Sequence, residues 1–200
     1  MKYYFYALMM ALSLISCDNN DNTHDDPRPI DKEMYQFEFK SYDVKNTVLY
    51  KGANGEKSMP DESYLNDYWS LYQEPAWKKI SLDLTNKTIR LISETSSTDF
   101  TYSFTIVNDS VLIKENNTDK PTYIGDFNKN TSTFTLKRTY RYIKRVPRTN
   151  EEGLLITKSA YFGTTQYENI FGNIFTTPSE MVKSGDQVLW TNIEYYYKKL

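Results

Sequence analysis

The sequence is poor in the side chains that most enzymes and metal sites use. Its 200 residues include one cysteine, Cys17, and one histidine, His24. A disulfide within the chain is therefore excluded, as are Ser-His and Cys-His nucleophilic pairs and zinc or haem sites built on His or Cys ligands. The seven glycines are scattered and form no phosphate-binding loop. We expect no catalytic residues, no metal and no cofactor.

Charge and hydrophobic runs exclude two further classes of protein. The formal net charge is -2, whereas a nucleic-acid-binding domain is usually strongly basic, so we expect no nucleic acid partner. After residue 16 no apolar run reaches the roughly 20 residues that a membrane-spanning helix needs. A carboxylate pair of the glycosidase type, an Asp-rich calcium site and a Ser/Lys arrangement remain open, but the sequence does not pair these residues. We expect the chain not to be an enzyme.

The N-terminus has the pattern of an export signal. Residues 1–17 read MKYYFYALMMALSLISC, in which Lys2 precedes an apolar stretch of signal-peptide length. The segment Leu14-Ile15-Ser16-Cys17 resembles the lipobox of bacterial lipoproteins. The resemblance implies that Cys17 receives diacylglycerol, that the chain is cut before it, and that the new amine is acylated. Several acyl chains, at about 0.8 kcal/mol per buried CH₂, give stable attachment to a membrane. We therefore expect residues 1–16 to be a signal peptide.

A polar segment follows the cysteine. Residues 18–33 read DNNDNTHDDPRPIDKE, and a segment with so little apolar surface forms a flexible tether, here spanning residues 17–33. A solvated linker explains His24 and its neighbouring aspartates better than a metal site does. The acidic residues resemble the surface-export signals of Bacteroidota lipoproteins, and retention on the inner face of the outer membrane is the alternative. We expect attachment to the outer membrane, facing either the periplasm or the cell surface.

The remaining residues, 34–200, predict a single β domain. Aromatic residues make up 16% of the chain, and together with Thr, Ile and Val they favour strands. Apolar residues alternate with polar ones around residues 36–40, 44–50, 80–91, 100–113, 123–142, 154–162 and 188–198, and short polar turns separate the strands. This pattern predicts an antiparallel meander of eight to ten strands. Helical spacing predicts one short helix over 61–72, and Thr177-Pro178 predicts another over 178–183.

Three segments carry a resemblance to a known architecture: TYSFTIVNDSVLIKE at 101–115, YIGDF at 123–127 and TFTLKR at 133–138. They resemble the lipocalin-like barrels of Bacteroidota lipoproteins, which implies an all-β meander closed as a barrel. A two-sheet sandwich satisfies the same alternation and remains open. A barrel of about eight strands holds one small ligand or is filled by its own side chains. We expect filling by aromatic residues, namely Phe100, Tyr102, Phe104, Phe134 and Tyr140.

A basic run between residues 137 and 148 contains no acidic residue. It is a candidate surface for lipid head groups, an anionic glycan or a protein partner. The alternative is a solvated hairpin end whose charges discourage edge pairing. The candidate interaction residues are Arg138, Tyr140, Arg141, Tyr142, Lys144 and Arg145.

The expected function is that of a membrane-anchored, exported lipoprotein acting as a non-enzymatic binding module for a small apolar ligand, a glycan or a protein. One alternative is an accessory or immunity/inhibitor-type envelope lipoprotein that binds a protein partner. Another is a carboxylate-dependent glycan hydrolase. An empty apolar cavity would favour a small ligand, a filled interior would favour a partner bound outside, and two facing carboxylates in a cleft would favour the hydrolase.

Overall fold

The computed structural model describes residues 33–58, 62–69, 72–94, 99–115, 120–163 and 170–200. The chain divides into two compact units, Met1–Asp31 and Lys32–Leu200, and every described residue belongs to the second. The expected signal peptide, Cys17, His24 and nearly all of the expected tether lie outside the described residues. Within the described ranges, no helix has the length and apolar character needed to cross a membrane.

The body is all-β, as the alternation predicts. The strands are β1 (Met34–Lys51), β2 (Glu56–Ser58), β3 (Lys79–Asp83), β4 (Thr88–Ile92), β5 (Phe100–Val107), β6 (Ser110–Lys114), β7 (Thr122–Asn128), β8 (Thr133–Arg145), β9 (Leu155–Phe162) and β10 (Gln187–Lys199). The two expected helices are single short 3-10 helices, η1 (Glu62–Asp67) and η3 (Pro178–Glu180). Both are shorter than expected.

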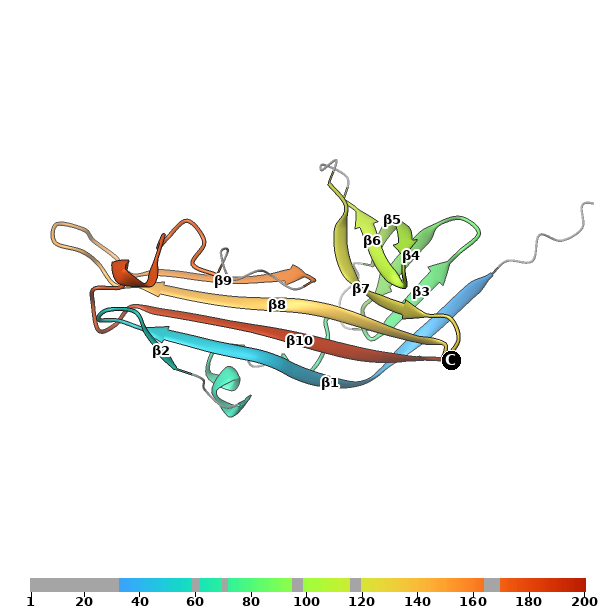
Figure 1. Cartoon of the computed structure of the whole chain (residues 1–200), viewed down its shortest axis with the longest axis horizontal. Coiled ribbons are helices and arrows are strands. Elements are labelled where there is room, and N and C mark those ends of the chain that lie inside the picture. Colours follow the sequence, from blue (N-terminus) through green and yellow to red (C-terminus); the bar gives the residue numbers. More distant parts are fainter. Residues whose placement is uncertain (1–32, 59–61, 70–71, 95–98, 116–119, 164–169) are drawn as a thin grey trace, which may run out of the picture. The chain divides into compact units, whose positions relative to one another are not determined.

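Eight of the strands close into an antiparallel barrel (Figure 1). β1 and β3 to β8 follow one another around it in sequence order, with β2 outside the ring, and each strand pairs with the next. β10 closes the ring because it pairs with β1 on one edge and with β8 on the other. The sandwich alternative is therefore wrong, and the closed meander is consistent with a lipocalin-like barrel.

Three strands are too long for the barrel and continue beyond it. β8 pairs with β7 as far as Leu136 and with β9 from Arg138 onward. β1 pairs with β3 as far as Glu38 and with β2 from Leu49 onward. The far halves of β1, β8 and β10 therefore form, with β2 and β9, an open sheet that we call the extension.

β1 corrects one expectation. The segments 36–40 and 44–50, expected as separate strands, belong to one strand of 18 residues. Shifts in its register against β10, between Phe39 and Ser41 and between Val44 and Asn46, absorb the polar residues that interrupt the alternation. Such bulges bend a strand without ending it.

The interior of the barrel is filled. The ring of Phe134 lies 5.9 Å from that of Phe37 and 6.4 Å from that of Tyr197, and all three residues are fully buried. Of the five residues expected to fill the interior, Phe104, Phe134 and Tyr140 are buried. Tyr102 is only half-buried and packs against the ring of Phe162, and Phe100 is 40% exposed and packs against the ring of Trp77.

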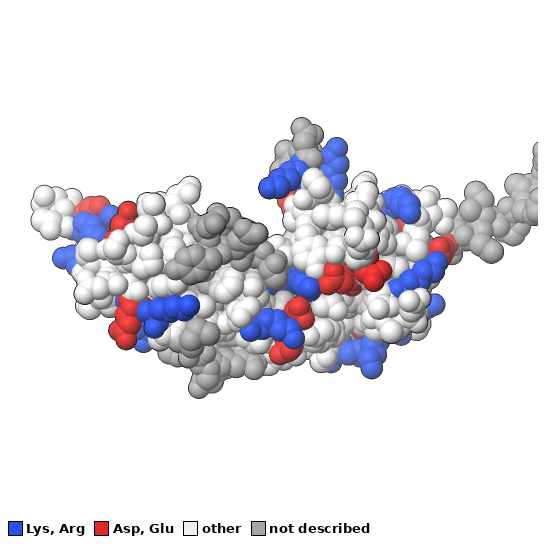
Figure 2. All heavy atoms as spheres, viewed as in Figure 1, with Lys and Arg blue, Asp and Glu red and all other residues white. Residues whose placement is uncertain are grey.

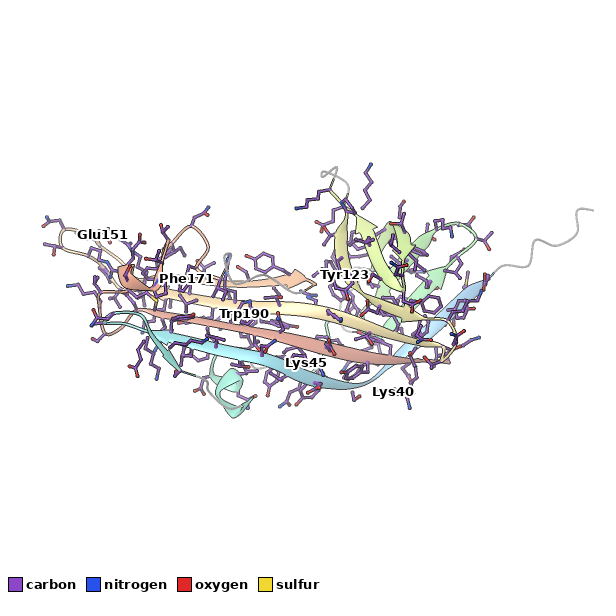
Figure 3. The ribbon with its side chains drawn as sticks, viewed as in Figure 1. Lys40, Lys45, Tyr123, Glu151, Phe171 and Trp190 are labelled. Atoms are coloured by element: carbon purple, nitrogen blue, oxygen red, sulfur yellow. The ribbon has the colours of Figure 1, made fainter. Side chains whose placement is uncertain are left out.

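The extension is covered on both faces by connecting segments. The face that continues the barrel interior meets the segment around η1, residues 62–69 and 72, which we call the η1 cover. Its residues Leu65 and Tyr72 join the same core as Leu49 and Leu189. The opposite face carries a second core, covered by residues 170–186 (Figure 1). In that core Phe171 packs edge-on against Tyr50, with ring centroids 5.0 Å apart. Figure 3 shows Phe171 on this cover, with Trp190 on β10.

Candidate functional site

The basic run lies on β8, where this strand leaves the barrel and enters the extension. Two of its members are not surface residues, because Tyr140 is only 9% exposed and Tyr142 only 8%. Trp69 packs against Tyr140 at 5.0 Å and Tyr68 against Tyr142 at 4.6 Å. The expectation that Tyr140 and Tyr142 form an interaction surface is therefore wrong, because the η1 cover packs over them.

Arg138 occupies the junction between the barrel and the extension. Its guanidinium lies 4.8 Å from the ring of Trp77 and 4.9 Å from that of Phe162, and these two rings stack on each other at 5.3 Å. Its Nε donates to the carbonyl oxygen of Tyr161 at 3.0 Å. A half-buried cation held by aromatic faces and a backbone carbonyl stabilises the mouth of the barrel. Arg138 is therefore a structural residue.

Other cations of the run are paired within the chain. Arg145 forms an ion pair with Glu151 at 2.7 Å, near the far end of the extension (Figure 3). Arg148 pairs with the buried Asp186 at 2.8 Å. Lys144 is half-buried on the same strand. The run therefore does not act as one continuous basic surface, and Arg141 is the member that faces a concavity.

A groove of about 900 Å³ opens beside Arg141. It lies between the β6–β7 hairpin and β9, and Figure 2 shows the molecule hollowed at this place. The lining combines charged, polar and aromatic side chains. The residues are Glu115, Lys120, Pro121, Thr122, Arg141, Ala160, Tyr161, Phe162, Gly172 and Asn173.

Arg141 and Tyr161 form a fixed pair in the groove. The guanidinium lies 5.1 Å from the centroid of the Tyr161 ring and donates to its hydroxyl group at 2.5 Å. Gly172 closes over the pair with a φ of 59°, and a Cβ at this position would approach a guanidinium nitrogen to 3.1 Å. Any other side chain here would be strained by the backbone conformation, and the guanidinium would have to move by a few tenths of an ångström. The pair presents an oriented guanidinium and an aromatic ring that is 38% exposed.

Tyr123, shown in Figure 3, anchors the hairpin wall next to the groove. Its hydroxyl donates to Asp126 at 2.8 Å, and the Lys137 ammonium binds the same carboxylate at 2.9 Å. Burial raises the pKa of Tyr123, and the hydrogen bond to Asp126 adds to this rise. Burial alone would lower the pKa of Lys137, but its hydrogen bonds to Tyr123 and Asp126 outweigh that effect and raise it. The network holds the wall in place.

The same network bears on the Ser/Lys alternative. The Ser110 hydroxyl donates to Asp126 at 3.2 Å, so it shares a carboxylate with Lys137. A lysine with a raised pKa stays protonated at neutral pH and does not serve as the base of a Ser/Lys pair. Among the described residues, no group of three or more His, Cys, Asp or Glu side chains could hold a metal ion.

Several residues of the groove escaped the sequence analysis. Tyr161, Gly172 and Asn173 come from the 155–175 region, which shows neither a charge cluster nor a motif. The sequence offers one indication of the groove. Adjacent residues of a strand point to opposite faces, so Arg141 lies on the face of β8 opposite to Tyr140. Comparison of the chain with protein-family models, with curated proteins and with solved structures finds no match.

Proposed function

We propose that this chain is a bacterial lipoprotein, attached to the cell envelope through Cys17, whose body is a non-enzymatic module that binds a glycan in the groove beside Arg141. The observation that carries the proposal is the contrast between the filled barrel and the open groove. Small-molecule sites are mostly enclosed and apolar. The site here is open and mixes charged, amide, hydroxyl and aromatic groups, so it suits an extended polar chain.

The chemistry of the lining matches that of a sugar. A pyranose ring has an apolar C–H face, which packs on an exposed aromatic ring such as that of Tyr161. Its hydroxyl groups need donors and acceptors with fixed directions, and the oriented Arg141 guanidinium and the exposed Asn173 amide supply these. Arg141 and Lys120 outnumber Glu115 among the charged residues of the lining. We therefore expect an acidic glycan to be preferred.

The proposed groove is tested by binding of residues 18–200 to an array of acidic and neutral glycans. We expect wild type to bind an acidic glycan, and Arg141→Ala and Tyr161→Ala to weaken this binding by about tenfold or more, as loss of about 1.4 kcal/mol implies. Arg90→Ala is the matched control, because Arg90 is an exposed arginine on the barrel. Retained far-UV circular dichroism shows that the variants fold. Failure of wild type to bind any glycan contradicts the proposal.

The proposed anchor is tested separately. The full chain and Cys17→Ala are expressed in a bacterium with lipoprotein processing, in the presence of radiolabelled palmitate. We expect label on wild type alone and loss of the variant from the membrane fraction. Equal membrane association of both chains, without label, contradicts the lipoprotein assignment and leaves the groove proposal unaffected.

A protein partner is the second candidate, favoured by one observation. Leu154, Leu155 and Ile156 are consecutive and are 50%, 43% and 48% exposed. Three exposed apolar residues in a row are unusual on a soluble surface and mark a contact region. These three residues lie at the start of β9 and just before it, whereas the groove is lined by the last residues of β9, and they lead to the inference below.

A further inference from the structure

β9 is an edge strand. It pairs with β8 along its whole length, from Leu155 opposite Arg145 to Phe162 opposite Arg138, without a bulge. No other strand in the described part of the chain pairs with it. An edge of this kind presents a row of backbone N–H and C=O groups that can pair with another chain.

The usual protection of an edge is missing from β9. The strand reads LITKSAYF, with no proline and with Lys158 as its only charged residue. The Lys158 ammonium donates to the carbonyl oxygen of Tyr68 at 2.8 Å and lies 6.0 Å from the ring of Trp69. The charge is thus held against the η1 cover and does not project along the edge. Leu155 and Ile156 point to opposite faces, yet both are exposed.

The register shows which backbone groups point outward. The Gly163 N–H donates to the carbonyl oxygen of Lys137 at 2.8 Å, just beyond the pair Phe162–Arg138. In an antiparallel pair, hydrogen-bonded and non-hydrogen-bonded positions alternate. The odd-numbered residues of β9 therefore direct their N–H and C=O groups at β8. The even-numbered residues direct theirs outward, namely Ile156, Lys158, Ala160 and Phe162.

We propose that β9 pairs with β9 of a second copy of this chain, antiparallel and centred on Ser159. In a two-fold symmetric pair of antiparallel strands, one residue lies opposite its own copy. The symmetric arrangements that pair the largest part of β9 place either Lys158 or Ser159 opposite its own copy. Centring on Lys158 places two like charges directly opposite each other, which is unfavourable.

Centring on Ser159 gives complementary neighbours throughout. Lys158 lies opposite the partner's Ala160, and Thr157 lies opposite the partner's Tyr161. Ile156 lies opposite the partner's Phe162, and pairs of β-branched with aromatic side chains stabilise a sheet. Each outward-facing residue also meets an outward-facing residue, so the hydrogen-bonding positions match. The two extensions then form one continuous sheet. Ala160, Tyr161 and Phe162 also line the groove, so the dimer and the proposed glycan share part of one surface, and the pairing is therefore tested without glycan.

The mass of residues 18–200 in solution tests the pairing. This chain contains no cysteine, because Cys17 is the only one, so a disulfide cannot produce the dimer. Light scattering over a roughly 100-fold range of concentration is expected to show a dimer that dissociates on dilution. Ala160→Pro removes an outward N–H without touching the ladder to β8, so a folded monomer is expected. Ala160→Ser keeps the N–H group and is the matched control, expected to remain a dimer.

A disulfide tests the register. Ser159 faces its own copy at a non-hydrogen-bonded position, where Cα atoms are about 4.5 Å apart, within the range that a disulfide spans. Ser159→Cys is expected to form a covalent dimer on mild oxidation, at least tenfold faster than Lys158→Cys. A wild-type monomer at every concentration overturns the proposal, as does a dimer that survives in Ala160→Pro. Faster cross-linking of Lys158→Cys overturns the register.

Discussion

The barrel and the extension share three strands, β1, β8 and β10, but hold them in different ways. In the barrel every strand has two hydrogen-bonded neighbours, and the inner faces meet in one closed core. In the extension β2 and β9 are edges, and both faces depend on covers made by connecting segments. Closure therefore stabilises one region without leaving a binding surface. The extension keeps the free edge of β9, and the groove lies where β9 meets the β6–β7 hairpin of the barrel.

The largest loss of stability is expected from the barrel core. Phe134→Ala removes a fully buried ring that contacts two other aromatic residues, and we expect it to lower the free energy of unfolding by about 3–5 kcal/mol. Urea unfolding followed by circular dichroism measures this change. Phe100→Ala is the control, because Phe100 is 40% exposed and should lose about 1 kcal/mol or less. Equal losses of unfolding free energy in the two variants would contradict the assignment of Phe134 to the barrel interior and of Phe100 to its mouth.

The next largest loss is expected at the far end of the extension. Asp186 is fully buried and accepts hydrogen bonds from Arg148 and from the backbone N–H groups of Val146 and Lys183. We expect Asp186→Asn to lower the free energy of unfolding by about 2–4 kcal/mol, because it leaves the Arg148 cation without its partner. Asp99→Asn, at an exposed ion pair with Arg90, should lose at most about 0.5 kcal/mol.

This loss depends on pH. Burial by itself raises the pKa of Asp186, but Arg148 and the two backbone N–H groups outweigh it and lower the pKa below its usual value. A carboxyl group whose pKa is lower in the folded state contributes stability above the unfolded value, about pH 3.9, and loses it as the pH falls through the folded value. The difference between wild type and Asp186→Asn should therefore be full at pH 7 and shrink below pH 4. If the difference in the free energy of unfolding between the two chains stays the same from pH 7 to below pH 4, the charge of Asp186 is not what stabilises the fold.

A smaller loss is expected where the η1 cover meets the barrel. The Tyr140 hydroxyl hydrogen-bonds to that of Tyr195 at 2.7 Å, and the Tyr195 hydroxyl donates to the carbonyl oxygen of Tyr72 at 2.5 Å. Tyr195→Phe breaks both bonds and should lower the free energy of unfolding by about 1–2 kcal/mol. Hydrogen exchange should speed up in the η1 cover before it changes in the barrel. Tyr196→Phe, on the outer face, should leave both the free energy of unfolding and the exchange rates unchanged.

The smallest change in stability is expected on β9. Ile156→Thr, made in the Ala160→Pro chain, should alter the free energy of unfolding by about 0.5 kcal/mol or less, because Ile156 is 48% exposed. Ile143→Thr is the matched change on β8, where the residue is fully buried, and should lose about 2 kcal/mol or more. Similar losses for both would mean that β9 is buried in the monomer, which would undermine its role as a contact strand.

The sequence predicts the barrel well and the extension poorly, for a physical reason. Alternation locates a strand and the face it buries, and the residues of β3 to β7 carry it clearly. It does not state which neighbour a strand has, so the change of partner on β8 between Leu136 and Arg138 leaves no trace in the sequence. The sequence places Tyr140 in both the interior set and the surface set, and Tyr142 in the surface set, because a tyrosine suits a rim as well as a core. Their burial depends on the η1 cover, which is distant in sequence.

The pairing of β1 with β10 sets the order in which this chain can acquire its structure. Phe37 lies opposite Lys199, almost the full length of the body away in sequence. Neither the ring nor the long sheet can form until β10 has been synthesised, because both need this strand. A nascent chain that lacks β10 therefore cannot reach its native state. The export that we propose for this chain requires an unfolded polypeptide, and the late entry of β10 into the fold is compatible with that requirement.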